Sequence, residues 1–225
     1  MISMRVSFGA ALAMALAFAL SPVKAQEAPR PQTVIIGLDM SKSNPLVEDQ
    51  AYAARVAQRA AGEIEHLPLR SRVMLRTFGS YDTGANALKI DEVISARSKP
   101  QAVAEGMSAI IAAIPRLIDE GKLQAQGYTN VVSFLENMSQ LVDCQASEVH
   151  VILLTDGFED SEYTKLASGG SLPTPDRLYP GCAELTMLGV GQGGGSPTST
   201  RRVREQWAHW AEAAGFEKFT GLYDW

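Results

Sequence analysis

Cysteine, histidine and clustered basic residues are scarce in this chain. Its 225 residues include two cysteines and three histidines, and 25 acidic residues outnumber 20 basic ones. Phosphate contacts require clustered lysine and arginine, so an acidic chain without a basic run argues against nucleic-acid binding. With 46% hydrophobic residues the chain is too apolar to be disordered. Its length is that of one domain with a full core.

Long apolar runs are also lacking, except for one at the N-terminus. Residues 6–20 are apolar or small, follow Arg5 and precede a short segment that ends in Ala25. This run of 15 residues is shorter than the ~18 that indicate a membrane-spanning helix. The pattern predicts a cleavable signal peptide at 1–25, with a retained membrane anchor as the alternative. We therefore expect a periplasmic or secreted protein with no membrane span in the mature chain, whose net charge falls from −5 to −7 when Arg5 and Lys24 are removed.

Segments with strand and helix patterns alternate along the rest of the chain. Residues 33–39 form an almost unbroken β-branched apolar run, which is typical of a strand buried on both faces. Pro115 predicts a kink or break in one of the helices. The alternation predicts the α/β class: a doubly wound, mostly parallel sheet with helices on both faces, in one domain at 33–225 after a linker at 26–32. Strands are expected at 33–39, 73–78, 87–95, 149–154, 185–190 and 216–222, and helices at 45–66, 101–119, 130–142 and 198–214.

Oxygen-bearing side chains follow three of these elements. The first strand ends in the pattern D-x-S-x-S, a threonine precedes the helix at 130–142, and an aspartate follows the strand at 149–154. Side chains two apart on an extended segment point the same way, so those of the D-x-S-x-S pattern can converge. Two carboxylates and three hydroxyls, without histidine or cysteine, suit a hard ion such as Mg²⁺. The candidate metal ligands are Asp39, Ser41, Ser43, Thr129 and Asp156.

The low charge of this set indicates what the metal would do. Hydroxyl ligands are neutral, and two carboxylates just balance a divalent ion. If a carboxylate acts through bound water, the ion stays electrophilic and accepts a carboxylate from outside. Such a site is better suited to binding an acidic partner than to enclosing a metal permanently.

The three segments, taken together, resemble the metal-ion-dependent adhesion site of von Willebrand factor type A domains. The likeness runs from Thr33 to about Leu222, and the segments appear in the family's order. It implies that Ser41 and Ser43 coordinate the ion directly, Thr129 directly or through water, and Asp39 and Asp156 largely through water. The ion would be Mg²⁺, or alternatively Mn²⁺ or Ca²⁺. The resemblance implies an adhesion or assembly module whose protein partner offers an Asp or Glu carboxylate.

A hydrolase of phosphate esters is the main alternative. Asp39 at a strand end could serve as its nucleophile, with Mg²⁺ as cofactor. Such enzymes usually place a second carboxylate two residues on, where this chain has Ser41. We therefore expect a binding module and not an enzyme, with no catalytic residue. A domain used only as structure is a third possibility, against which the complete metal set argues.

The segment at 158–181 leaves the same strand end as Asp156. Its 24 residues exceed the usual length of a connection, which favours a functional loop. Its acidic residues Glu159, Asp160 and Glu162 could form a second cation site or a solvated face, and the solvated face is the expectation. We expect this loop to set the choice of partner.

Two further features have structural interpretations. Trp207 and Trp210, three apart on the last expected helix, are predicted to pack in the core and at its rim, with a recognition stripe as the alternative. Cys144 and Cys182 lie in the exported part, where an isolated pair favours one disulfide over two buried free thiols. Each stands just before a strand, and these two strands should be neighbours in a doubly wound sheet. The bridge is therefore expected at the edge opposite the metal site.

Overall fold

The computed structural model describes residues 29–224, apart from 81–83, 85 and 195. The expected signal peptide at 1–25 lies outside the described residues. The strands are β1 (Gln32–Asp39), β2 (Arg72–Phe78), β3 (Lys89–Val93), β4 (Glu148–Leu154), β5 (Cys182–Leu188) and β6 (Phe216–Leu222). The helices are α1 (Gln50–Gly62), α2 (Pro100–Ala112), α3 (Ile114–Asp119), α4 (Val131–Ser139) and α5 (Pro197–Ala214), with short 3₁₀ turns η1 (Pro45–Val47) and η2 (Leu166–Ser168).

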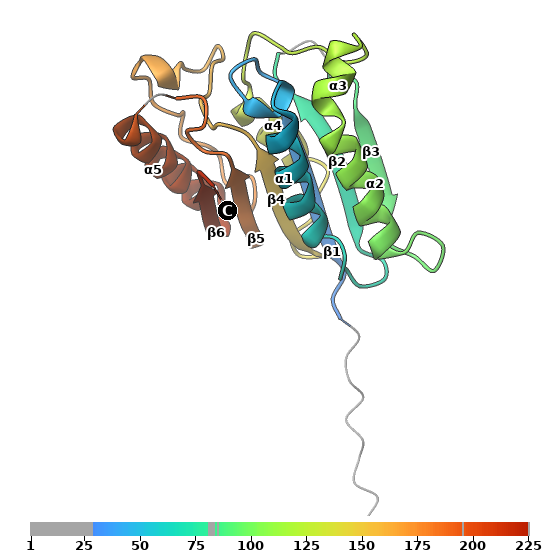
Figure 1. Cartoon of the computed structure of the whole chain (residues 1–225). Coiled ribbons are helices and arrows are strands. Elements are labelled where there is room, and N and C mark those ends of the chain that lie inside the picture. The colour runs from blue at the N-terminus through green and yellow to red at the C-terminus, as the bar shows by residue number, and fades with distance from the viewer. Residues whose placement is uncertain (1–28, 81–83, 85, 195, 225) are drawn as a thin grey trace, which may run out of the picture.

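The strands form one sheet in the order β3-β2-β1-β4-β5-β6. β3 runs antiparallel to β2, and the other neighbouring pairs are parallel. The predicted α/β class, a mostly parallel sheet flanked by helices on both faces, is confirmed (Figure 1). The strand order reverses between β1 and β4, and in open α/β sheets ligands bind beyond the carboxyl ends of the strands at such a point.

β1 occupies the centre of the sheet because both of its faces are apolar. Val34, Ile36 and Leu38 pack in a core with α1, α2 and α3. Ile35 points the other way, into a core built with α4 and α5. The two cores make the molecule three layers thick, with β1 and β4 in the middle layer.

Two expected helices are divided in the structure. The segment expected to be helical at 45–66 starts as η1, and α1 begins only at Gln50, because the Asp49 side chain accepts hydrogen bonds from the amides of Ala51 (2.8 Å) and Tyr52 (2.9 Å). The segment at 101–119 breaks at Ala113, between α2 and α3. Pro115 causes this predicted break, since it has no N–H to continue the helical hydrogen bonds.

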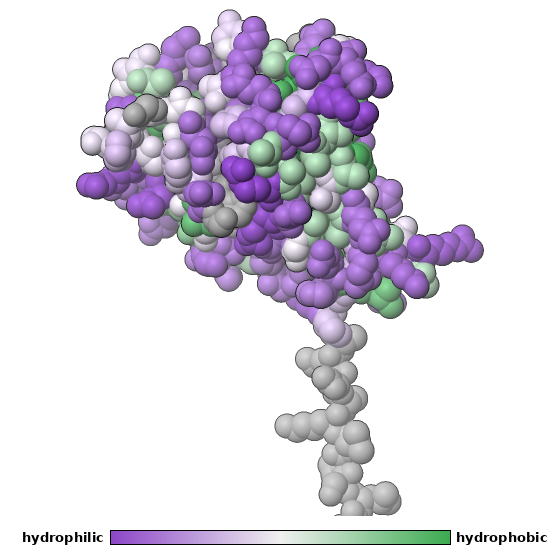
Figure 2. All heavy atoms as spheres, in the orientation of Figure 1, coloured by the Kyte–Doolittle hydropathy of each residue, from purple (hydrophilic) through white to green (hydrophobic). Residues whose placement is uncertain are grey.

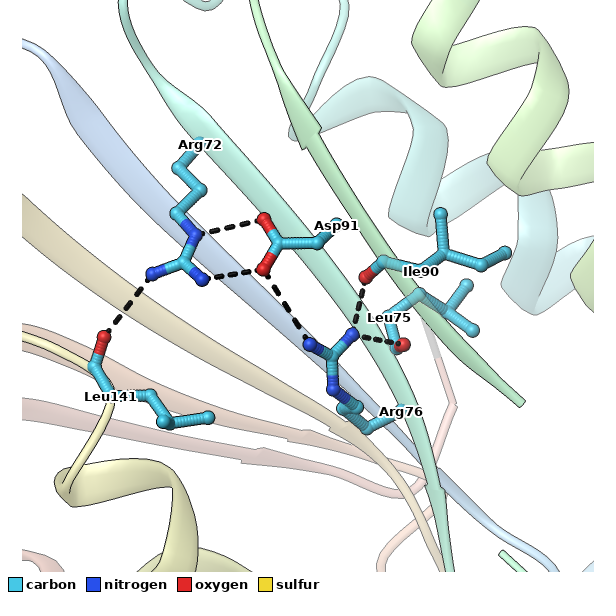
Figure 3. A network of polar contacts seen from close by, with 6 residues as sticks. All are labelled: Arg72, Leu75, Arg76, Ile90, Asp91 and Leu141. Carbon is cyan, nitrogen blue, oxygen red and sulfur yellow. Dashed lines mark hydrogen bonds and ion pairs between the residues drawn. The ribbon is translucent and has the colours of Figure 1, made fainter. Parts of the chain in front are cut away.

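The edge strand β3 pairs with β2 through backbone hydrogen bonds along five residue pairs, and charged side chains add to this contact. Its side chains are largely exposed, so little apolar burial fixes it to β2. Arg72 of β2 donates to both carboxylate oxygens of Asp91 on β3, and Arg76 lies 3.5 Å from the same carboxylate (Figure 3). The hydrogen bonds from Arg72 hold the pKa of Asp91 below its usual range. Arg72 also reaches the carbonyl of Leu141, beyond the end of α4, at 3.3 Å.

The surface above α1 and α2 is mostly hydrophilic, with a patch of apolar residues over α2 (Figure 2). None of the helices in the described part has the length and apolar character that crossing a membrane requires.

Cys144 and Cys182 are joined in a disulfide, with their Cα atoms 4.9 Å apart. Cys182 is the first residue of β5, which pairs with β4. The bridge therefore lies at the amino ends of these strands, opposite the edge that carries the candidate metal ligands, as expected from the sequence.

Candidate metal centre

Asp39 is the last residue of β1, and its side chain is fully buried. One carboxylate oxygen, Oδ1, accepts a hydrogen bond from the amide of Ser41 at 2.8 Å. The other, Oδ2, accepts one from the hydroxyl of Thr155 at 2.7 Å. Both oxygens are thus oriented by neighbours, and the carboxylate cannot turn freely.

The two serines of the D-x-S-x-S pattern face the same side. Their Oγ atoms lie 3.2 Å apart, with Ser41 buried and Ser43 exposed. They do not converge through an extended segment as predicted, because the chain turns there: the amide of Asn44 donates to the carbonyl of Ser41 at 3.1 Å. The turn, not the strand pleat, brings the hydroxyls together.

Asp156 lies just beyond β4 with its side chain fully buried. Its Oδ1 accepts a hydrogen bond from the amide of Phe158 at 3.0 Å. Its Oδ2 is buried and makes no hydrogen bond with any described residue. A Cβ atom at Gly193 would stand 2.5 Å from this oxygen and 2.7 Å from the carbonyl oxygen of Ser43. The glycine therefore leaves a small space beside an unsatisfied oxygen.

Thr129 precedes α4 and is 2% exposed. Its backbone is paired with that of Asp160 in both directions, with N–H···O distances of 3.1 and 3.0 Å. The loop that follows β4 therefore holds Thr129 at the edge where the other ligands lie.

Four of the five predicted ligands, Ser41, Ser43, Thr129 and Asp156, line one cavity of about 430 Å³. Asp39 lies close by: the charge of Asp156 is among the causes that raise its pKa. The structure thus brings the five predicted residues to the carboxyl ends of β1 and β4. No described group of three or more His, Cys, Asp and Glu side chains is arranged to hold a metal. The candidate donors predicted from the sequence are two carboxylates and three hydroxyls.

Two buried carboxylates share this small region. Burial, and then the charge of Asp156, raises the pKa of Asp39 to about 7. Burial also raises the pKa of Asp156, and two groups oppose this rise: the amide of Phe158 and the nearby hydroxyl of Ser43, which forms no hydrogen bond to Oδ2. Within the described residues, no lysine or arginine forms an ion pair with either aspartate. The pair therefore lacks a compensating positive charge from the chain itself.

Two residues that build the site were not found from the sequence. Asn44 is fully buried, and its Nδ2 donates to the carbonyls of Asp39 and Leu154, each at 2.9 Å. It therefore joins the ends of β1 and β4. Thr155 accepts from the amide of Gly157 at 3.0 Å while donating to Asp39. Both residues are adjacent in sequence to a predicted ligand. Their contacts with the other strand end, however, can be identified only once the strand order is known.

The acidic residues of the 158–181 loop have unlike surroundings. Glu159 is fully buried, so the expected solvated face is wrong for this residue. Its Oε2 accepts hydrogen bonds from the amides of Val131 (2.8 Å) and Val132 (3.2 Å), in the first turn of α4. These amides have no partner inside the helix, and Asn130 provides no side-chain cap. Asp160 pairs with Lys165 at 3.0 Å, and Glu162 is exposed.

No protein-family model and no curated protein sequence matches the chain. Among solved structures, it is similar to the PilB minor pilin from Streptococcus sanguinis, at 12% identity and a TM-score of 0.45, over 91% of this chain and 59% of that one. A conserved hypothetical protein, BatB from Bacteroides thetaiotaomicron, matches at 14% identity and a TM-score of 0.45, over 86% of this chain and 91% of that one. The pilus adhesin SpaC from Lactobacillus rhamnosus matches at 17% identity and a TM-score of 0.49, over 88% of this chain and 29% of that one. The chain thus spans 59% of the PilB structure, and identities this low say nothing about its function.

Proposed function

We propose that the chain is an exported, metal-dependent protein-binding module of the von Willebrand factor type A kind. Its metal site would consist of Asp39, Ser41, Ser43, Thr129 and Asp156. The single observation that carries the proposal is the buried, unsatisfied Oδ2 of Asp156 in a cavity that Ser41, Ser43 and Thr129 also line. A buried carboxylate oxygen without a partner is costly, and a cation removes that cost.

The donors fit a divalent ion that prefers oxygen, such as Mg²⁺, Mn²⁺ or Ca²⁺. When bound, the ion would supply a Lewis-acidic position open to a partner's carboxylate. The chain's own residues orient the donors: Asn44 fixes the strand ends, and Thr155 fixes Asp39. The site would therefore need little rearrangement to bind its ion.

Lys42 at the cavity could contact an acidic protein partner. It lines the cavity, is exposed and forms no ion pair with another described residue, so it can attract a carboxylate. Tyr128, next to Thr129, is 55% exposed, and Tyr163 on the 158–181 loop is 45% exposed. Exposed tyrosines are enriched at protein interfaces. The 158–181 loop, which contributes to the cavity wall, is the proposed determinant of partner choice.

The hydrolase alternative is less well supported by the geometry. Both oxygens of Asp39 are hydrogen-bonded and the residue is fully buried, so it is poorly placed to attack a phosphate ester. None of the three histidines lines the cavity. His150 lies on β4 beside Glu148, toward the opposite edge of the sheet. We therefore propose a binding role without catalysis.

Export remains part of the proposal. It is supported by the N-terminal sequence pattern and by the disulfide between Cys144 and Cys182, since such bonds persist in oxidising compartments.

A pull-down with the immobilised mature chain tests the binding role. Captured proteins should appear with Mg²⁺, disappear with chelator, and be competed by a short aspartate-containing peptide. Asp39→Ala should abolish capture, whereas Glu65→Gln, an exposed change after α1 at the opposite edge, should not. Capture that is equal with Mg²⁺ and chelator would contradict the proposal.

A turnover assay separates the two candidate functions. With Mg²⁺ or Mn²⁺, the purified chain should hydrolyse no generic phosphate ester or carboxylic ester. Turnover that vanishes in Asp39→Asn would favour the hydrolase.

A further inference from the structure

Trp207 of α5 reaches the segment that carries Asp156. Its indole N–H donates a 2.8 Å hydrogen bond to the carbonyl oxygen of Gly157, 50 residues away in sequence. Trp207 is fully buried, and Gly157 directly follows Asp156. Gly157 has a φ of +76°, a conformation that other residues rarely adopt. A sharp turn beside the candidate metal ligand is therefore held from α5.

One peptide unit connects the indole to the carboxylate. The carbonyl that Trp207 contacts belongs to the peptide bond between Gly157 and Phe158, and the N–H of that same bond donates to Oδ1 of Asp156 at 3.0 Å. A trans peptide is planar, and its C=O and N–H point in opposite directions. Fixing the carbonyl toward Trp207 therefore directs the N–H toward Asp156.

This arrangement leaves the other oxygen of Asp156 toward the cavity. With Oδ1 bound to the Phe158 amide, Oδ2 is the atom that remains unsatisfied beside Gly193. Hydrogen bonds in series also polarise one another, so the indole strengthens the amide as a donor. Loss of the indole N–H should therefore loosen the carboxylate and weaken the bond that orients it.

Packing alone does not explain this hydrogen bond. Trp210 is also buried in the same core and meets Trp207 edge to face, with ring centroids 5.7 Å apart. Its indole N–H has no hydrogen-bond partner among the described residues. The same core therefore accommodates one indole whose N–H is unused and one whose N–H holds the turn after Asp156.

We propose that Trp207 is a positioning residue for the metal site, acting on Asp156 through the Gly157–Phe158 peptide. The inference rests on the proposed metal-binding function and adds a residue outside the ligand set.

The matched variants are Trp207→Phe and Trp210→Phe, which each keep an aromatic ring and remove one indole N–H. In chelator, amide hydrogen exchange of Phe158, followed by NMR, should accelerate about five- to tenfold in Trp207→Phe, as expected for a bond worth about 1 kcal/mol. It should not change in Trp210→Phe. Equal exchange of this amide in both variants would overturn the inference without any reference to metal.

Calorimetric titration with Mn²⁺ connects the same bond to the site. Trp207→Phe should bind about fivefold more weakly than the wild type, and Trp210→Phe within about twofold of it. Equal affinity of all three proteins would overturn the role of Trp207 and leave the proposed function standing. No binding by the wild type would overturn both.

A measurement on the wild type alone keeps the inference testable if Trp207→Phe does not fold. Adding Mg²⁺ should shift the indole N–H resonance of Trp207 and leave that of Trp210 nearly unchanged. Equal shifts, or no shift at Trp207 while Mg²⁺ binds, would contradict it.

Discussion

At the scale of single residues, Asn44 connects the two strands that carry the candidate ligands. Its amide group bonds the carbonyls of Asp39 and Leu154, so removal leaves two buried acceptors without partners. Asn44→Ala should lower the free energy of unfolding by about 2–4 kcal/mol, measured by urea denaturation. Asn137→Ala, an exposed change on α4, should have little effect. Equal free energies of unfolding of the two variants would contradict the role of Asn44 in joining the two strand ends.

Gly193 provides a second test at this scale. A Cβ atom there would stand 2.5 Å from Oδ2 of Asp156, whereas one at Gly127, which lines the same cavity, would meet nothing within 4 Å. Gly193→Ala should weaken Mg²⁺ binding at least about tenfold, the scale of changes around a metal site. Gly127→Ala should bind as the wild type does. Full Mg²⁺ affinity in Gly193→Ala would show that the ion lies elsewhere.

These residues also show what the sequence could predict at this scale. The candidate ligand set stands in local patterns whose residue types match a hard cation, so it could be proposed without a structure. Asn44 reaches Leu154, 110 residues away, Trp207 reaches Gly157, 50 residues away, and Gly193 lies beside Asp156, 37 residues away. No local pattern encodes such contacts.

At the scale of elements, α4 and the 158–181 loop are joined by Glu159. Burial raises the pKa of Glu159 to about 7 from its ordinary value of 4.5, and Asp160 adds to this, while the Ser161 hydroxyl and the amides of Val132 and Val131 oppose it. The folded state therefore holds the proton more tightly than the unfolded chain does. The resulting stabilisation is present below about pH 4.5 and is lost as the pH rises through about 7.

Glu159→Gln has no titrating group at this position. The free energy of unfolding of Glu159→Gln minus that of the wild type should therefore be larger at about pH 8 than at about pH 5. Urea denaturation in chelator at both pH values measures the difference. Glu162→Gln, on the same loop with an exposed side chain, is the matched control. A relative loss of stability in Glu159→Gln at the higher pH would reverse the sign and contradict the burial argument.

The sequence predicts a secondary-structure element well where the interactions that determine it lie within a few residues. The β-branched run of β1 and the proline that divides α2 from α3 act within a few residues, and both predictions are confirmed. The division of the first helix was missed although its signal is also local, because the prediction used the apolar spacing over 45–66 and not the capping side chain of Asp49. The burial of Glu159 was missed because its partners belong to α4, 27 and 28 residues earlier.

At the scale of the whole molecule, the disulfide and the candidate metal centre lie at opposite edges of the sheet. A bridge between residues 38 apart in sequence should contribute about 4 kcal/mol on the chain-entropy model. The double variant Cys144→Ser/Cys182→Ser should lose about that much in urea denaturation and retain its Mg²⁺ affinity. A large loss of Mg²⁺ affinity in a folded double variant would show that the two edges are coupled.

The sheet order explains why the candidate metal ligands come together. β1 and β4 are adjacent and parallel at the point where the order reverses, so Asp39 and Asp156 meet although 117 residues separate them. The alternation of strands and helices predicted this class of sheet, and the D-x-S-x-S pattern pointed to the edge that carries the candidate site.

Calorimetric titration of Mg²⁺ into the metal-stripped mature chain tests the central claim most directly. The wild type should bind about one Mg²⁺ per chain. Asp156→Ala and Ser41→Ala should lose this binding while circular dichroism shows that both remain folded, because the apolar cores do not depend on the ion. Full Mg²⁺ affinity in Asp156→Ala would contradict the account.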